Sequence, residues 1–193
     1  ARQMHCSFVA GGTLFVIGGG TDVTEAFDPE TDSWTEKQRM PQPLTGMSCT
    51  LVNDTQLFVI GGMFSNGTLN TQVLLYDTAT DLWSAAPVPA MSDSDRPRMG
   101  HSAVFLPSRQ QLLVMGGRDA DGLAARSADT QPVPSLADVR ILQLPVAGTS
   151  AEWIPGCALP AGTAFAPAGL VDSFSATDGV AVADQSATAA AAA

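Results

Sequence analysis

The chain has 193 residues, of which 45% are hydrophobic and only 15% charged, and it contains 18 glycines and 13 prolines. This composition favours strands and turns over helices, in a chain long enough to form one domain with its own core. The formal net charge is −10 and Lys37 is the single lysine, which argues against nucleic acid or an anionic membrane as a partner. No apolar stretch approaches the length needed to cross a bilayer.

Self-similarity along the chain is its most informative feature. Three short apolar runs each end in a pair of glycines, at Gly18-Gly19, Gly61-Gly62 and Gly116-Gly117. Each run follows an earlier apolar run, and turn residues separate the two, at Gly11-Gly12, Asn53-Asp54 and Pro107-Ser108. Two apolar runs joined in this way are typical of a β-hairpin.

An aromatic residue and a tryptophan follow the first two glycine pairs. Phe27 precedes Trp34 by seven positions, and Tyr76 precedes Trp83 by the same distance. Each unit is therefore predicted to be a sheet of four short antiparallel strands in an all-β fold, with Trp34 and Trp83 largely buried between neighbouring sheets. A period of roughly fifty residues is typical of the blades of a kelch-type β-propeller.

Residues 2–155 resemble the kelch family. The family's start to the innermost strand appears fully as Arg98-Met99-Gly100-His101 and partly as residues 2–5, whereas residues 44–47 depart from it. In the third repeat the aromatic position is Leu142, and Trp153 lies beyond the usual distance, after an insertion of about residues 118–135.

The resemblance implies three clear blades, at about residues 2–40, 43–89 and 98–155. Residues 156–185 are predicted to be a degenerate blade or a linking segment, in which residues 173–183 form a possible hairpin, and residues 186–193 are an alanine-rich tail. Three or four blades do not close a propeller of the usual size. The chain, which starts at Ala1 without an initiator methionine, is therefore expected to be an excised piece or part of a larger assembly.

Two kinds of polar residue recur at equivalent positions. His5 and His101 each lie three residues after an arginine, and packing with hydrogen bonding explains this pairing better than a metal site, because no third ligand stands out. Aspartates precede the tryptophans at matched offsets, at Asp28, Asp32, Asp77 and Asp81. Their spacing favours turns in which a carboxylate bonds nearby backbone amides over a cation site.

Cysteines and sequons bear on the cellular compartment. Cys6 and Cys49 occupy like positions in adjacent repeats and are predicted to be buried free thiols, because such positions are expected to be too far apart for a disulfide; Cys157 is the third cysteine. Asn53 and Asn66 begin sequons in predicted loops, which indicates candidate glycosylation sites. With the acidic, lysine-poor composition, they favour a secreted or cell-surface glycoprotein, although a cytoplasmic one stays open.

The resemblance also implies a partner-binding face. In kelch propellers this face is built by the loop before the innermost strand and by the loop after the glycine pair. The matching residues here are Arg2, Arg39, Arg98, Arg118, Met63, Phe64, Ser65 and Asn66. Arginines and aromatics are common anchors at interfaces, but these arginines are equally suited to supporting the turns.

Two functions follow from the resemblance. The first is a non-catalytic, cofactor-free protein-interaction or scaffold module within a larger protein or complex. The alternative is the kelch portion of a secreted copper-radical oxidase, because residues 98–104 also resemble the galactose and glyoxal oxidase group. That group uses tyrosines and a cysteine at its copper centre, and the single tyrosine here, Tyr76, occupies the structural aromatic position. The oxidase alternative therefore places the catalytic residues outside this segment.

Overall fold

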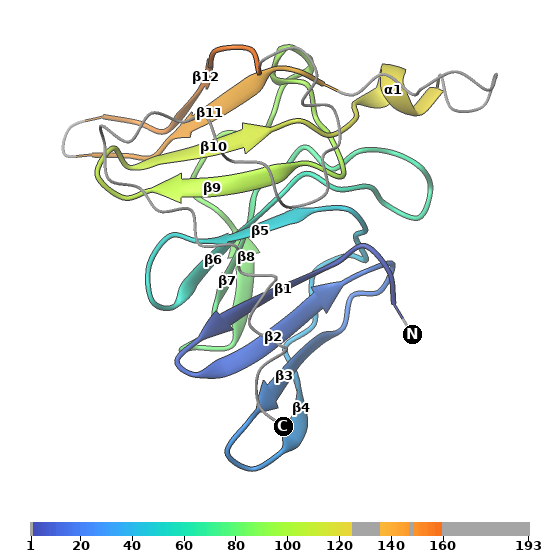
Figure 1. Cartoon of the computed structure of the whole chain (residues 1–193), viewed down its shortest axis with the longest axis vertical. Coiled ribbons are helices and arrows are strands. Elements are labelled where there is room, and N and C mark those ends of the chain that lie inside the picture. Colours follow the sequence, from blue (N-terminus) through green and yellow to red (C-terminus); the bar gives the residue numbers. More distant parts are fainter. Residues whose placement is uncertain (1, 125–135, 147–148, 160–193) are drawn as a thin grey trace.

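The computed structural model describes residues 2–124, 136–146 and 149–159. These residues form three four-stranded antiparallel sheets, each with its strands in sequence order, which stack as a fan of blades (Figure 1). The predicted all-β, kelch-type fold is therefore confirmed. The possible hairpin at 173–183, the alanine-rich tail and most of the insertion lie outside the described residues.

The first two blades follow the predicted repeat. The first blade contains β1 (His5–Ala10), β2 (Thr13–Gly18), β3 (Thr24–Asp28) and β4 (Ser33–Lys37). The second contains β5 (Ser48–Leu51), β6 (Gln56–Ile60), β7 (Leu74–Asp77) and β8 (Leu82–Ala85). Gly11 and Gly12 join β1 to β2 with φ angles of 56° and 80°, the positive values that a tight hairpin turn with the right twist requires.

The third blade contains β9 (Ser102–Leu106), β10 (Gln111–Met115), β11 (Val139–Gln143) and β12 (Glu152–Pro155). The helices among the described residues are short: the 3-10 helix η1 (Asp93–Asp95) precedes β9, and α1 (Ala120–Ala124) follows β10. None of the helices there is long and apolar enough to span a membrane.

Two apolar clusters hold the blades together, one on each side of the second sheet. Alternate residues of β6 point to opposite clusters, so Leu57 and Val59 pack toward the first blade while Phe58 and Ile60 pack toward the third. Burial on both faces explains why β6 is a continuous apolar run rather than an alternating one.

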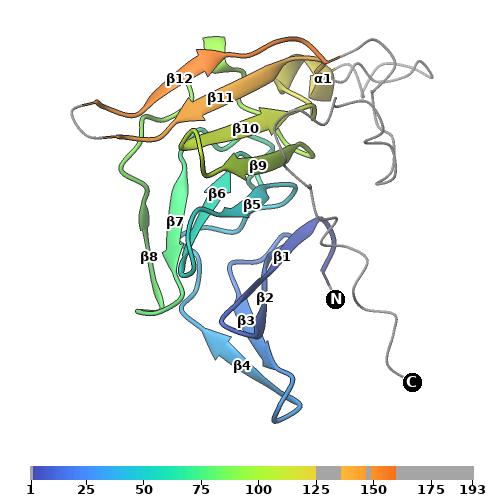
Figure 2. The same cartoon turned by 60° about the vertical axis from the view of Figure 1, so that its left-hand side comes forward.

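The innermost strands lie close together, and the blades spread outward from them (Figure 2). The glycine pairs make this approach possible. A Cβ atom on Gly61 would lie 2.4 Å from the carbonyl oxygen of Arg98, and one on Gly117 would lie 2.6 Å from that of Met99. Gly62 donates its N–H to the same Arg98 oxygen at 2.9 Å, so the glycine pair of one blade binds the loop that enters the next.

Candidate functional site

An open pocket of about 660 Å³ lies where the loops of the second and third blades meet. One side is the loop between β6 and β7, and the other combines the segment before β9 with the start of the β10–β11 connection. The lining residues are Gly67, Thr68, Leu69, Thr71, Asp93, Arg96, Pro97, Asp119, Ala120, Asp121 and Leu123. These are the two kinds of loop that the kelch resemblance assigns to a binding face.

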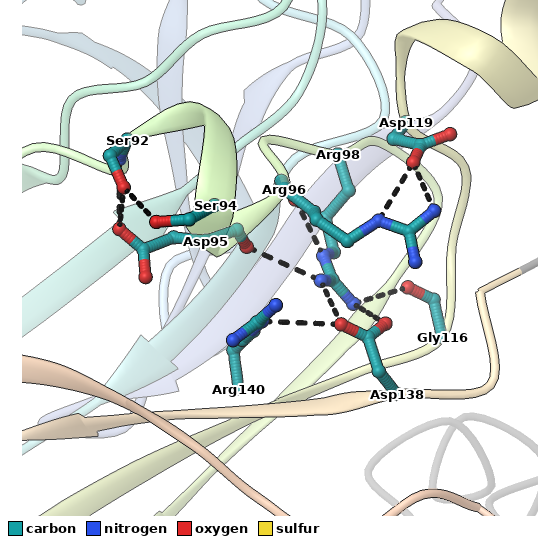
Figure 3. A network of polar contacts seen from close by, with 9 residues as sticks. All are labelled: Ser92, Ser94, Asp95, Arg96, Arg98, Gly116, Asp119, Asp138 and Arg140. Atoms are coloured by element: carbon teal, nitrogen blue, oxygen red, sulfur yellow. Dashed lines mark hydrogen bonds and ion pairs between the residues drawn. The ribbon is translucent and has the colours of Figure 1, made fainter.

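Next in sequence to the lining residues Arg96 and Pro97, the buried Arg98 forms an ion pair with Asp138 (Figure 3). The guanidinium of Arg98 bonds both carboxylate oxygens of Asp138, at 3.0 and 3.1 Å, and also the carbonyl oxygens of Arg96 and Gly116. Burial tends to raise the pKa of the Asp138 carboxyl, but hydrogen bonding and charge from Arg98, with the charges of Arg96 and Arg140, hold it below the ordinary value.

Arg96 is the cation at the wall of the pocket. Its backbone is left-handed, with φ of 57°, where the chain leaves η1, and its Nε donates to Asp119 Oδ2 at 2.9 Å. The Arg96 side chain is 42% exposed, and Asp93 and Asp121 line the same pocket. Three carboxylates and one guanidinium therefore give the pocket an acidic character, which suits a basic side chain of a partner.

The predicted binding residues do not form one patch. Ser65 and Asn66 are exposed at the tip of the β6–β7 loop, next to the pocket. Met63 and Phe64 are half-buried, and Phe64 packs against the first apolar cluster. Arg118 is also half-buried, and its backbone pairs with Met99.

The remaining predicted arginines are engaged within the blades. The Arg98 side chain has an exposed fraction of 0% and bonds the carbonyl oxygens of Arg96 and Gly116, which favours the alternative that it supports the turns. Arg2 pairs with Glu25 in the first blade and bonds the carbonyl of Gly18. Arg39 is exposed but pairs with Asp22 and Glu36.

The pocket residues Asp93, Arg96, Asp119 and Asp121 were missed by the sequence prediction. They lie in segments that the repeat pattern does not cover, before β9 and after β10. The available signal was the run of residues 92–98, Ser-Asp-Ser-Asp-Arg-Pro-Arg, in which Ser92 and Asp95 form the hydrogen-bonded start of η1.

The two histidines have different environments. His101 is buried and bonds Ser48 through Nε2 at 2.7 Å, which links the innermost strands of two blades. Burial, reinforced by the charge of Arg98, lowers the pKa of His101 to about 3. The packing interpretation is confirmed for His101, whereas His5 is exposed. The described part of the chain contains no group of three residues placed to hold a metal.

The predicted free thiols at Cys6 and Cys49 are wrong. The two cysteines form a disulfide, with Cα atoms 6.1 Å apart. Both lie on innermost strands, where the blades converge, so equivalent positions there come within bonding range. Cys157 is free and exposed.

The tryptophans differ from the prediction in their burial. Trp34 is 56% exposed, so its predicted burial is wrong, and Trp83 is half-buried. The difference arises because the second blade packs against the first, while no described segment covers the outer face of the first blade. Tyr76 stacks on Trp83 and is fully buried; burial and a hydrogen bond to Asp81 raise its pKa.

Two of the four recurring aspartates, Asp28 and Asp77, bond nearby backbone amides as predicted, whereas no such bond is made by Asp32 or Asp81 within the described residues. Asp28 accepts the N–H of Glu30 at 2.9 Å, and Asp77 accepts that of Ala79 at the same distance. Asp81 has a further role, because its carboxylate accepts both the Tyr76 hydroxyl and the backbone N–H of Gln38.

The fold is that of β-propeller blades, and comparison with known proteins identifies kelch repeats in the first two. The Kelch motif model matches residues 1–41 and 45–87. Kelch-like protein 15 of Danio rerio is 32% identical over 103 residues, which cover 47% of this chain and 17% of that protein. Alpha-scruin of Limulus polyphemus is 25% identical over 215 aligned positions, which cover 80% of this chain and 23% of that protein.

Kelch-like protein 35 of Mus musculus is also similar, at 28% identity over 125 residues. It matches 62% of this chain, which spans only 19% of its length. The chain therefore carries kelch repeats and is similar, over part of its length, to these kelch-repeat proteins. The copper-oxidase alternative stays a prediction, because its catalytic residues were placed outside these blades.

Proposed function

We propose that the chain is a non-catalytic kelch module and that the acidic pocket between its second and third blades binds a basic segment of a protein partner. The proposal is carried by the convergence of Asp93, Asp119 and Asp121 on one open pocket at the loop face. Because Asp119 is already paired with Arg96, the pair Asp93 and Asp121 carries the charge that is available to a ligand.

Contacts within the blades hold the segments around the pocket in place. The Arg98–Asp138 pair ties the segment before β9 to the segment before β11, and backbone hydrogen bonds between Met99 and Arg118 hold the segment before β9 to the start of the β10–β11 connection. Such preorganisation lowers the ordering cost of binding. The exposed tip at Ser65 and Asn66 adds an adaptable polar rim beside the acidic wall.

A positional peptide library tests this function. The chain should select peptides that contain lysine or arginine, and the double variant D93N/D121N should bind the selected peptides about ten-fold more weakly, since interfacial charge pairs contribute at least that much. The matched control is Asp54→Asn, an exposed aspartate in the β5–β6 turn, which should change nothing. Selection without any preference for basic peptides would contradict the proposal.

A further inference from the structure

Each blade contact in this chain includes a clamp on the segment that leaves the preceding blade. In the second blade, Trp83 donates its indole N–H to the carbonyl of Gln38 at 2.9 Å. Asp81 accepts the N–H of the same Gln38, also at 2.9 Å. Both backbone groups of one residue, which follows directly after β4, are thus held by two side chains.

The third blade repeats the clamp with one informative change. Trp153 donates to the carbonyl of Pro89 at 3.0 Å. A proline has no N–H to offer, and the residue two positions before Trp153, which corresponds to Asp81, is Ala151. The carboxylate is present where the clamped residue has an N–H and absent where it does not.

The clamped segments also share an anchor. Two residues after Gln38 and Pro89 come Met40 and Met91, each buried in an apolar cluster between blades. The N–H of Met40 bonds the carbonyl of Asp22, and that of Met91 bonds the carbonyl of Thr71, which in both cases lies just ahead of the third strand of the blade. The segment that packs against the next blade therefore consists of a clamped residue and, two positions later, a buried apolar residue.

The same parts are unused at the two ends of the described fan. On the first blade, Asp32 and Trp34 occupy the clamp positions, and Asp32 has the left-handed φ of 49° that matches 55° at Asp81. Both side chains are exposed, and neither makes a hydrogen bond within the described residues. Asp32 and Trp34 therefore form an unoccupied clamp that, like Asp81 and Trp83, has a carboxylate to accept a backbone N–H.

After β12, the third blade carries an unused docking segment. Leu159 donates its N–H to the carbonyl of Ala137, just ahead of β11, which makes it the counterpart of Met40 and Met91. Cys157, two residues earlier, is then the counterpart of Gln38 and has an N–H to donate. Cys157 is exposed and Leu159 is only partly buried. The free segment therefore matches the free clamp in its hydrogen-bonding groups.

A second line of contacts near the innermost strands is open at both ends in the same way. Gly46 donates its N–H to the carbonyl of Met4 at 3.0 Å, and Gly100 donates to that of Gly46 at 2.7 Å. All three residues are left-handed, with φ between 54° and 65°. A further blade could continue this line at Met4 or at Gly100.

We infer that the clamp formed by Asp32 and Trp34 holds residues 157–159 of a second copy of this chain, and that two copies join head to tail in a ring. The three described blades cannot close by themselves, whereas those of two copies make six, within the four to eight that propellers use, and those of three copies would exceed that range. A twofold axis makes both joints identical and covers both end faces of the described fan. This inference rests on the proposed function only in that the chain is a kelch interaction module, and it makes no use of the acidic pocket.

Sedimentation of the 193-residue chain tests the inference. The chain should be a dimer, and Trp34→Ala or Leu159→Asp should each weaken association at least about ten-fold, since a buried tryptophan anchor typically contributes that much. Leu82→Ala, which truncates another exposed apolar side chain on β8, is the matched control and should leave the dimer intact. Cys157→Ser keeps both backbone groups and should also leave it intact, which excludes an intermolecular disulfide.

Mixing and pairing experiments identify the head-to-tail joint. An equimolar mixture of the Trp34→Ala and Leu159→Asp chains retains one intact joint per dimer, so it should associate more strongly than either variant alone. Asp32→Ala and Cys157→Pro should each weaken the dimer. Together the two substitutions reproduce the Ala151–Pro89 arrangement. The double variant should therefore dimerise at least as tightly as whichever single variant dimerises less tightly.

A chain that is monomeric at the highest concentration it tolerates would overturn the inference, as would a dimer indifferent to both Trp34→Ala and Leu159→Asp. Either result would mean that the clamp formed by Asp32 and Trp34 binds a different polypeptide. A monomer that still selects basic peptides would overturn the dimer alone, whereas a dimer without peptide selection would count against the acidic pocket alone.

Discussion

Arg98 and Asp138 form a two-point ion pair that joins the segment before β9 to the segment before β11, with the Arg98 side chain completely buried and Asp138 25% exposed. Asp138→Ala should lower the free energy of unfolding by about 3 kcal/mol, the lower end of the range for removing one partner of a buried pair. Urea unfolding measures the loss, and Asp54→Ala, at an exposed aspartate, should cost less than about 0.5 kcal/mol. A loss below about 1 kcal/mol for Asp138→Ala would show that Arg98 reaches water when the pair is broken.

His101 should make stability depend on pH. Its pKa is lowered from 6.5 to about 3 in the folded chain, mainly by burial, so between these values the unfolded chain binds a proton that the folded chain does not. The contribution is fully present above pH 6.5 and declines as pH falls toward 3, by about 1.4 kcal/mol per pH unit. Urea unfolding at a series of pH values should show this slope, which His101→Gln removes and the exposed His5→Gln leaves unchanged. An equal slope in the His101 variant would assign the effect to other groups.

The blades could be predicted from the sequence because each repeats the same local chemistry. The glycine pairs mark where one blade approaches the loop of the next, and the two apolar runs around each turn can only form a hairpin with a buried face. The disulfide between Cys6 and Cys49 could not be predicted in this way. It depends on how closely the innermost strands converge, which is a property of the stacked blades and not of any one repeat.

The candidate site was predictable only in part. The loops to which the resemblance points do line the pocket, and Asn66 lies beside it, but the Arg98 side chain is buried. The charged residues that line the pocket lie outside the repeat pattern, in segments that have no hydrophobic period, so no pattern marks them. The exposure of Trp34 could not be foreseen either, because its burial requires a neighbouring blade on a face that no described residue covers.

Trp83 and Trp34 are equivalent in the repeat but should differ in their contribution to stability. Trp83 stacks on Tyr76 and bonds Gln38 across the blade contact, so Trp83→Ala should cost about 3 kcal/mol. Trp34 contacts Phe27 but is 56% exposed, so Trp34→Ala should cost less than about 1 kcal/mol in dilute protein, where no second copy is bound. Urea unfolding of the two variants side by side measures the difference. Equal losses would mean that the first blade is covered even in dilute solution.

The two sequons should differ in their use if the chain passes through a glycosylating compartment. In both, the asparagine Oδ1 accepts the N–H of the threonine two residues later, at 3.0 Å. The Asn53 amide nitrogen already donates to Gln56, whereas that of the exposed Asn66 makes no hydrogen bond within the described residues and is free to react.

Expression in secreting eukaryotic cells, followed by enzymatic removal of N-linked glycans, should therefore give a mobility shift that Asn66→Gln abolishes and Asn53→Gln leaves largely intact. A glycan at Asn66 would stand beside the acidic pocket, because Gly67 and Thr68 line it. Glycosylated wild-type chain should then bind basic peptides more weakly than the Asn66→Gln variant from the same cells. A shift that survives Asn66→Gln would assign the glycan to Asn53, and an unshifted chain would remove the argument for glycosylation at either site.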